Sequence, residues 1–113
     1  MSDNCLFCKI IQGQIPAAKL YEDDDVLAFG DINPQAPTHF LVIPKKHLAG
    51  PDAVTEDDQP LIGKVMRVGA TIARERGVES FRFVVNNGAA AGQTVYHFHL
   101  HVMGGRPMTW PPG

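Results

Sequence analysis

His97-Phe98-His99-Leu100-His101-Val102-Met103 alternates histidines with apolar residues near the C-terminus. Successive side chains of a β-strand point to opposite faces of the sheet. The three histidines therefore share one face, and Phe98, Leu100 and Val102 share the other, which can pack against a core. Imidazoles titrate near neutral pH and act as bases, nucleophiles or metal ligands. The run thus predicts a half-buried strand whose polar face carries the chemistry of the protein.

The bulk properties of the chain are those of one ordinary globular domain. It has 113 residues, of which 44% are apolar and 19% are charged, so it can build one core and has no room for a second. A formal net charge of −2 provides no basic surface for nucleic acid, and no apolar run reaches the length of a membrane span. The start of the chain lacks a secretory signal pattern. We therefore expect a single domain over 1–113, in the cytoplasm, with neither nucleic acid nor membrane as a partner.

Two helices are expected. A short one over 5–12 would bury three apolar residues, Leu6, Phe7 and Ile10. A long one over 55–76 has Thr55 as its N-cap and acidic residues in its first turn, where the helix dipole favours negative charge. Four apolar residues at helical spacing give the long helix a buried stripe: Leu61, Val65, Val68 and Ile72.

Apolar runs bounded by turn residues predict the strands. Four of them lie at 19–22, 26–29, 38–43 and 81–85, and the histidine run is the fifth. The acidic cluster at 22–25 predicts an exposed turn. Short, hairpin-like connections favour an α+β fold, in which an antiparallel five-stranded sheet carries one long and one short helix on one side.

A loop rich in glycine and alanine, Gly88–Thr94, precedes the histidine run. Small residues let backbone N–H groups converge on an anion. Alone, such a loop is usually a flexible connection. Beside three histidines, it predicts a phosphate cradle next to a nucleophile.

The histidine run allows more than one chemistry. A single histidine on a strand is most often a hydrogen-bonded structural residue. Three imidazoles can hold a catalytic Zn²⁺ with one open position, but the outer pair would lie about 13 Å apart along a strand, so at most two could share a metal. Covalent catalysis by one imidazole, supported by the others, fits the run better.

Cys5-Leu6-Phe7-Cys8 is the other candidate for metal chemistry. A structural zinc takes four nitrogen or sulfur ligands. Because the chain has no further cysteine, histidines would have to complete such a site. The spacing is not that of a zinc finger, so these residues alone leave both a metal site and two free thiols open.

The run His97–Met103 matches the His-φ-His-φ-His-φ-φ signature of the histidine-triad (HIT) superfamily, where φ is an apolar residue. Phe29–His47 closely resembles the Hint branch of that superfamily, as do Gly92–His97, Gly104–Arg106 and Trp110–Gly113. The resemblance implies a HIT domain that hydrolyses nucleoside phosphoramidates, chiefly purine ones, and aminoacyl adenylates. It also implies a homodimer whose two sheets join.

The resemblance also implies roles for individual residues. His99 would be the nucleophile that attacks the α-phosphorus, His101 would orient the phosphate, and His39 would be the buried partner behind the nucleophile. Thr94 would lie near the leaving group, and Asp31 would take the ribose hydroxyls. The remaining nucleotide contacts would be a base pocket of Ile10, Phe29 and Ile32, a phosphate shell of Asn86, Gly92 and Val95, and Trp110 in a tail near the partner's active site.

Zinc-bearing members of the superfamily, which this chain also resembles, join a Cys-x-x-Cys pair to two histidines. The matching positions imply a structural zinc on Cys5, Cys8, His47 and His97, and no catalytic metal. Two other functions remain open: a nucleotide-binding module with little turnover that acts as an interaction protein, and a metal-dependent hydrolase.

Overall fold

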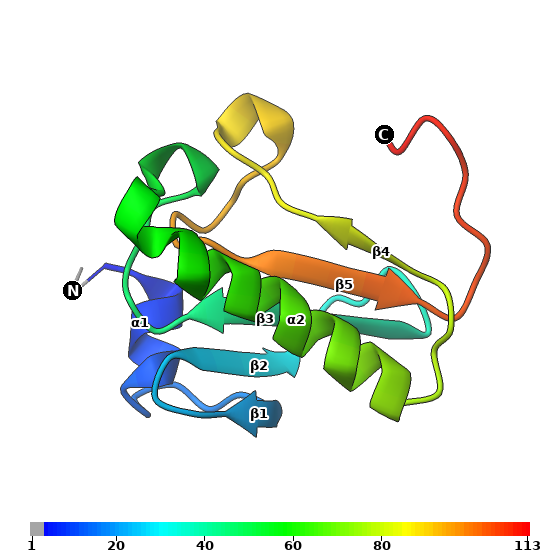
Figure 1. The fold of residues 1–113 in the computed structure, drawn as a ribbon, viewed down its shortest axis with the longest axis horizontal. Coiled ribbons are helices and arrows are strands. Elements are labelled where there is room, and N and C mark those ends of the chain that lie inside the picture. Colours follow the sequence, from blue (N-terminus) through cyan, green and yellow to red (C-terminus); the bar gives the residue numbers. More distant parts are fainter. Residues whose placement is uncertain (1–3) are drawn as a thin grey trace.

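A computed structural model describes residues 4–113 and contains one five-stranded sheet (Figure 1). The strand order is β1-β2-β3-β5-β4, and all neighbouring strands are antiparallel. This confirms the expected α+β architecture. The strands are β1 Lys19–Glu22, β2 Val26–Gly30, β3 Thr38–Pro44, β4 Phe81–Val84 and β5 Leu100–Gly104.

The two helices cover opposite faces of the sheet, not one side as expected. Val26 and Ala28 of β2 pack in one core with the long helix α2, Gln59–Glu75. Leu27 and Phe29 alternate with them and pack in a second core with the short helix α1, Leu6–Ile11. Because four consecutive residues of β2 are buried, this central strand needs cover on both faces.

Helix α1 buries two of the three residues that were expected to face inward. Phe7 and Ile10 are buried, but Leu6 is 42% exposed.

Helix α2 is preceded by a short turn that fixes its start. A single 3₁₀ turn, η2 Glu56–Asp58, precedes α2, and Thr55 caps it. The backbone N–H of Thr55 donates to the buried carboxylate of Asp58 (2.9 Å), and Lys46 Nζ lies 2.6 Å from the same carboxylate. This ion pair anchors the start of α2 to the loop after β3.

Two further 3₁₀ turns are η1, Pro51–Ala53, and η3, Ala89–Ala91.

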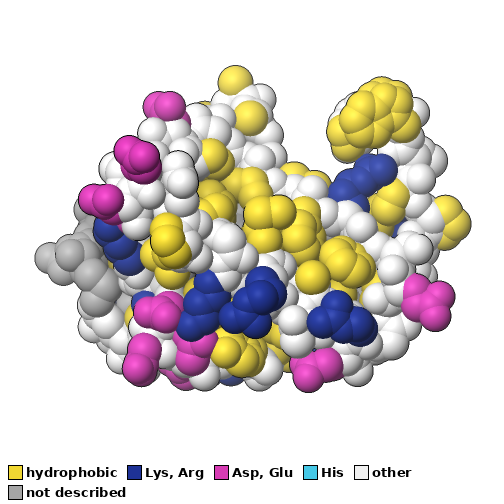
Figure 2. All heavy atoms as spheres, in the orientation of Figure 1, with side chains coloured by type: hydrophobic (Ala, Val, Ile, Leu, Met, Phe, Trp, Pro, Cys, Tyr) yellow, Lys and Arg dark blue, Asp and Glu magenta, His cyan; other side chains and the backbone are white. Residues whose placement is uncertain are grey.

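The face of the sheet that carries α2 also shows apolar side chains at the surface (Figure 2). Phe81 and Phe83 of the edge strand β4 are half-buried there. Within residues 4–113, no helix is both long and apolar enough to cross a membrane.

The histidine run only partly forms the expected strand. β5 begins at Leu100, so His97 and His99 lie in an irregular segment before it. The backbone N–H of Phe98 donates to the carbonyl of Leu48 (2.6 Å), which draws this segment away from the sheet ladder. The predicted separation of faces holds, because Phe98, Leu100 and Val102 all lie in the α2 core. The histidines lie on the other side, toward α1.

Candidate active site

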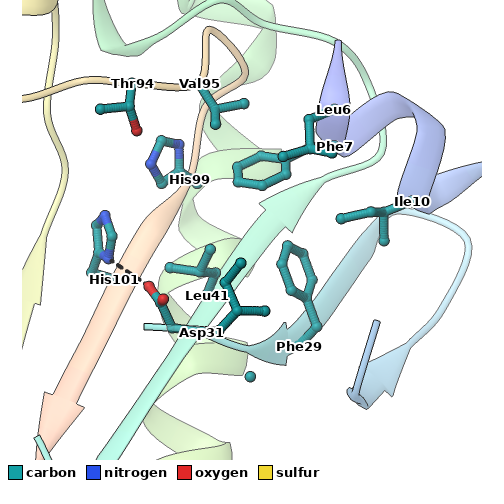
Figure 3. Close-up of a pocket in the computed structure, with 12 residues that line it drawn as sticks. Leu6, Phe7, Ile10, Phe29, Asp31, Leu41, Thr94, Val95, His99 and His101 are labelled. Carbon is teal, nitrogen blue, oxygen red and sulfur yellow. Dashed lines mark ion pairs between the residues drawn. The ribbon is translucent and has the colours of Figure 1, made fainter. Parts of the chain in front are cut away.

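A cavity of about 240 Å³ lies between α1, the end of β2 and the segment that leads into β5 (Figure 3). One part of it is apolar, with Phe7 and Ile10 from α1 and Phe29 and Leu41 from the sheet. The other part presents polar side chains, and these are Asp31, Thr94, His99 and His101. Such a cavity can hold a ligand with an apolar ring at one end and a charged group at the other.

A backbone carbonyl determines which nitrogen of His99 can react. Nδ1 of His99 lies 2.8 Å from the carbonyl oxygen of His97. A carbonyl only accepts, so Nδ1 carries the proton and Nε2 keeps its lone pair. The ring is buried and is held edge to face against Phe7, with 5.1 Å between ring centroids. His99 is therefore an oriented imidazole with a basic nitrogen available for the cavity.

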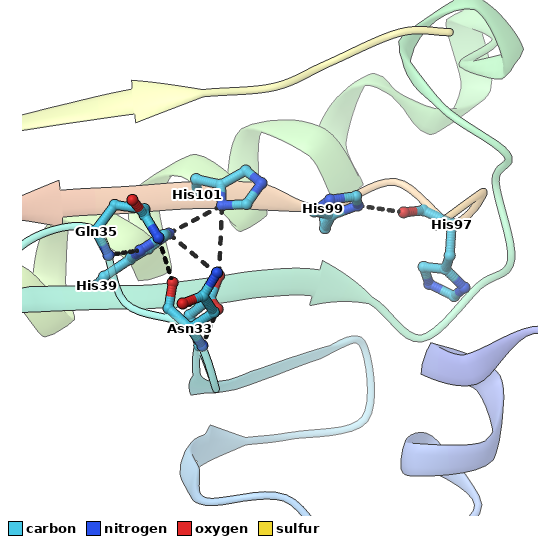
Figure 4. Close-up of polar contacts among 7 residues, drawn as sticks. Asn33, Gln35, His39, His97, His99 and His101 are labelled. Atoms are coloured by element: carbon cyan, nitrogen blue, oxygen red, sulfur yellow. Dashed lines mark hydrogen bonds and ion pairs between the residues drawn. The ribbon is translucent and has the colours of Figure 1, made fainter. Parts of the chain in front are cut away.

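A chain of hydrogen bonds gives His101 the other tautomer, with its proton on Nε2 and not on Nδ1 (Figure 4). The backbone N–H of Gln35 donates to Nδ1 of His39 (2.9 Å), so His39 carries its proton on Nε2. That Nε2 lies 3.0 Å from Nδ1 of His101, which therefore accepts. His101 is left with its proton on Nε2 and can donate a hydrogen bond.

Burial keeps these two rings neutral. Desolvation lowers the pKa of His101 to about 4, despite the opposing effect of the Asp31 carboxylate. Desolvation also lowers the pKa of His39, again against the charge of Asp31. At neutral pH both imidazoles are uncharged, so His101 acts as a neutral donor.

The position of His39 differs from the expected one. We expected it behind the nucleophile, but its ring hydrogen-bonds to His101 and not to His99. The reason is register, because His39 pairs with Met103 on β5, which places the side chain beyond His101 and away from the start of the strand.

Asp31 both caps a turn and faces the cavity. Its Oδ1 accepts the backbone N–H of Asn33 (2.8 Å), as in an Asx turn. Its Oδ2 lies 3.3 Å from Nε2 of His39 and 3.8 Å from Nδ1 of His101. The turn therefore fixes the carboxylate on the cavity wall, where it can accept hydrogen bonds from a ligand.

Asp31, His39 and His101 place three potential ligand atoms close together, as a metal site would. However, the Gln35 N–H uses the lone pair of His39 Nδ1, so the Nε2 that faces the cluster is protonated in the neutral ring. A protonated nitrogen cannot bind a metal. Hydrogen bonding accounts for this cluster.

A second cluster, of Cys5, Cys8, His47 and His97, has the chemistry of a structural metal site. One ligand atom from each lies within 4.8 Å of all the others. Three sulfur–nitrogen separations are 3.3–3.5 Å, and the two Nδ1 atoms are 3.2 Å apart. A tetrahedral zinc with bonds of about 2.0 Å to nitrogen and 2.3 Å to sulfur requires similar separations, about 3.3 Å between two nitrogens and about 3.5 Å between nitrogen and sulfur.

The protonation of His97 also fits metal binding. Its Nε2 lies 2.7 Å from the carbonyl oxygen of Pro44 and therefore donates, which leaves the Nδ1 lone pair directed at the sulfurs. Burial lowers the pKa of His97 to about 4, so the ring is neutral. The residues present thus fit a Cys₂His₂ zinc site, which would join α1 to the histidine run.

The cavity brings together most, but not all, of the residues expected to bind nucleotide. Ile32 lines it although its side chain is fully exposed. Three expected residues do not line it, and these are Asn86, Gly92 and Trp110, the last of which is 83% exposed. Four lining residues were not anticipated as site residues: Leu6, Phe7, Gly30 and Leu41. Of these, Leu41 could have been inferred, because period-two alternation within β3 puts it on the face of His39.

Comparisons with known proteins show the family to which this chain belongs. Residues 4–110 match the family model described as "Scavenger mRNA decapping enzyme C-term binding". A HIT-like protein of Synechocystis is 52% identical over the full length of both chains.

Two solved structures are also similar. One is a HIT family hydrolase from Legionella pneumophila, with 52% identity, a TM-score of 0.95, and coverage of 97% of this chain and 100% of the other. The second is a HIT family hydrolase from Clostridium thermocellum, with 40% identity, a TM-score of 0.93 and coverage of 96% of each chain.

Proposed function

Because this chain belongs to the histidine-triad (HIT) superfamily, we propose that it is a Hint-type hydrolase of nucleoside 5′-phosphoramidates. Its preferred substrates are purine nucleotides joined to an amine through a P–N bond, and aminoacyl adenylates are also cleaved. One observation carries the proposal: the cavity combines an oriented His99, an apolar wall and a carboxylate. The similarity to two HIT family hydrolases supports the reaction class.

The cavity suits a nucleotide in one orientation. The base packs between Ile10, Phe29 and Ile32, where its apolar faces leave water. Asp31 accepts hydrogen bonds from the ribose hydroxyls. This places the α-phosphorus at the polar end, within reach of His99.

His99 carries out the first step as a nucleophile. Its Nε2 lone pair forms a bond to phosphorus as the P–N bond to the leaving amine breaks. The Nε2–H of His101 and backbone N–H groups of the segment before His97 stabilise the charge on the non-bridging oxygens. The departing nitrogen needs a proton, which the Thr94 hydroxyl passes to it.

Water completes the cycle. Its oxygen bonds to phosphorus as the bond from phosphorus to Nε2 breaks, and the proton that it loses returns to Thr94, which replaces the one taken by the amine in the first step. The nucleoside monophosphate then leaves. The fixed Nδ1–H bond to the His97 carbonyl keeps the His99 ring in place through both steps.

Zinc has a structural part in this proposal. Cys5, Cys8, His47 and His97 would hold it, and it would supply a rigid link between α1 and the segment that carries His99. We further propose that the protein is a homodimer, because Trp110 is too exposed to serve its own core.

The test uses His99→Ala with an adenosine phosphoramidate. Wild-type protein should turn over many times and should carry one nucleotidyl group when quenched without acid and measured by mass spectrometry. His99→Ala should lose turnover by several orders of magnitude but still bind AMP. Met66→Ala, on the exposed side of α2, serves as the control and should match wild type. Near-normal turnover by His99→Ala, or no adduct on wild type, would overturn the proposal.

A further inference from the structure

A second hollow, of about 500 Å³, adjoins the nucleotide cavity. The two share Leu6, Thr94 and Val95. From there the second hollow extends along His47, Ala49 and Tyr96, and we call it the outer groove. The two spaces therefore meet at these three residues.

The shared residues lie at the reacting end of the nucleotide cavity. In Figure 3, Thr94 and Val95 lie on the segment next to His99, on the opposite side of the cavity from Phe29. A nucleotide with its base against Phe29 and its phosphorus at His99 has its base and ribose in the first cavity. The part of the substrate that continues past Thr94 is the leaving group, and the outer groove is the space open to it.

The lining of the outer groove defines the chemistry of what it accepts. Leu6 is 42% exposed and Tyr96 is 51% exposed, so both offer apolar surface to a ligand. Among the residues of 4–113 that line the groove, none carries a carboxylate, an ammonium or a guanidinium group. A charged substituent there would lose water without gaining an ionic partner.

We propose that the outer groove is a leaving-group subsite for amines with an apolar, preferably aromatic, substituent. This inference rests on the proposed function. Tyr96 is its specificity-determining residue, because its half-exposed ring can stack on an aromatic leaving group or cover an aliphatic one. Since its contact is made beyond the reacting atoms, Tyr96 governs which amine is released and not whether the P–N bond breaks.

The test compares three adenosine phosphoramidates whose amines are ammonia, 2-phenylethylamine and ethylenediamine. For wild type, kcat/KM should be about tenfold higher for the phenylethyl compound than for the other two, as expected for burying part of one aromatic ring. Tyr96→Ala should reduce this preference to about twofold while leaving kcat/KM for the ammonia compound unchanged. Tyr96→Phe and Met66→Ala should keep it.

A charge-bearing variant provides a second readout. Tyr96→Glu should reverse the order and favour the ethylenediamine compound, whose free end is an ammonium. Hydrolysis of all three compounds at equal rates by wild type would overturn the subsite and leave the proposed function intact, and so would an unchanged preference in Tyr96→Ala with an unchanged melting temperature. Failure of wild type to hydrolyse any of the three would overturn both.

Discussion

Replacing His101 with asparagine should remove a large part of the acid sensitivity of this protein. His101 is only 20% exposed at its side chain, and desolvation lowers its pKa to about 4. In the unfolded chain the same imidazole has a pKa near 6.5. At pH values between these two pKa values, the imidazole is protonated in the unfolded chain and neutral in the folded protein. Acid therefore favours unfolding, and the stability present above about pH 6.5 is lost as the pH falls toward 4.

The size of the effect follows from the two pKa values. At pH 4.5 the unfolded imidazole is almost fully protonated and the folded one mostly neutral, which lowers the free energy of unfolding by about 2.5 kcal/mol. At pH 7.5 both states are neutral and the effect is close to zero. His101→Asn cannot titrate and has no such loss at this position. An asparagine amide also keeps a polar group near Asp31 and His39.

The assay is urea unfolding of wild type and His101→Asn at pH 7.5 and 4.5, with equal zinc in all samples. Between the two pH values wild type should lose about 2.5 kcal/mol more than the variant does. Titrating groups that do not contact His101, the zinc ligands among them, affect both proteins alike and cancel in this difference. Met66→Ala should lose as much as wild type. Equal losses in wild type and His101→Asn would show that His101 is not desolvated in the folded protein, and the argument for a neutral donor would fail.

Three more predictions concern the metal, the ribose and the tail. Elemental analysis should find one zinc per chain, and Cys8→Ser should lose it and melt at least 5 °C lower, whereas an unchanged metal content would refute the Cys₂His₂ assignment. Asp31→Asn should reduce the preference for ribo- over deoxyribonucleotide phosphoramidates by about tenfold, and an unchanged ratio would leave Asp31 with its turn-capping role alone. Deleting residues 109–113 should change the melting temperature by less than 2 °C, because Trp110 is exposed, yet alter the rates for different leaving amines; a large drop in melting temperature would place the tail in its own core.

The strands and the long helix were predictable because their signals are local. Alternating or continuous apolar runs between turn residues mark β1 to β4, and the stripe from Leu61 to Ile72 marks α2. Both signals depend only on the spacing of apolar residues that is characteristic of a strand or a helix. The capping box of Thr55 is equally local, since the two residues that form it are three positions apart.

The placement of α1 was not predictable in the same way. A six-residue helix has too little periodicity to show which face it buries, and here Phe7 is buried while Leu6 is 42% exposed, although both line the cavity. The continuous apolar run Val26–Phe29 was visible in the sequence and is typical of a strand covered on both faces, but we expected both helices on one side. The sequence did not show which segment of the chain covers the second face of the sheet.

The three histidines of the run illustrate a further limit, because residues of one type, two positions apart, acquire three different chemistries. The tautomer of each ring is set by a hydrogen bond to a backbone group or to another imidazole. The Pro44 carbonyl leaves the Nδ1 lone pair of His97 able to bind a metal, and the His97 carbonyl leaves His99 with a free Nε2. The Gln35 N–H, acting through His39, makes His101 a donor.

These backbone groups explain why the spacing of the histidines alone could not assign their roles. Alternation places the rings on one face, but a tautomer depends on the partner that each ring meets in the folded chain. Pro44 lies 53 positions from His97, and His39 lies 62 positions from His101. The role of His101 therefore depends on the sheet register between β3 and β5, which brings it to His39, whereas the contact that orients His99 is local to its own segment. A shift of that register by one residue would turn His101 to the other face of the sheet and separate it from His39.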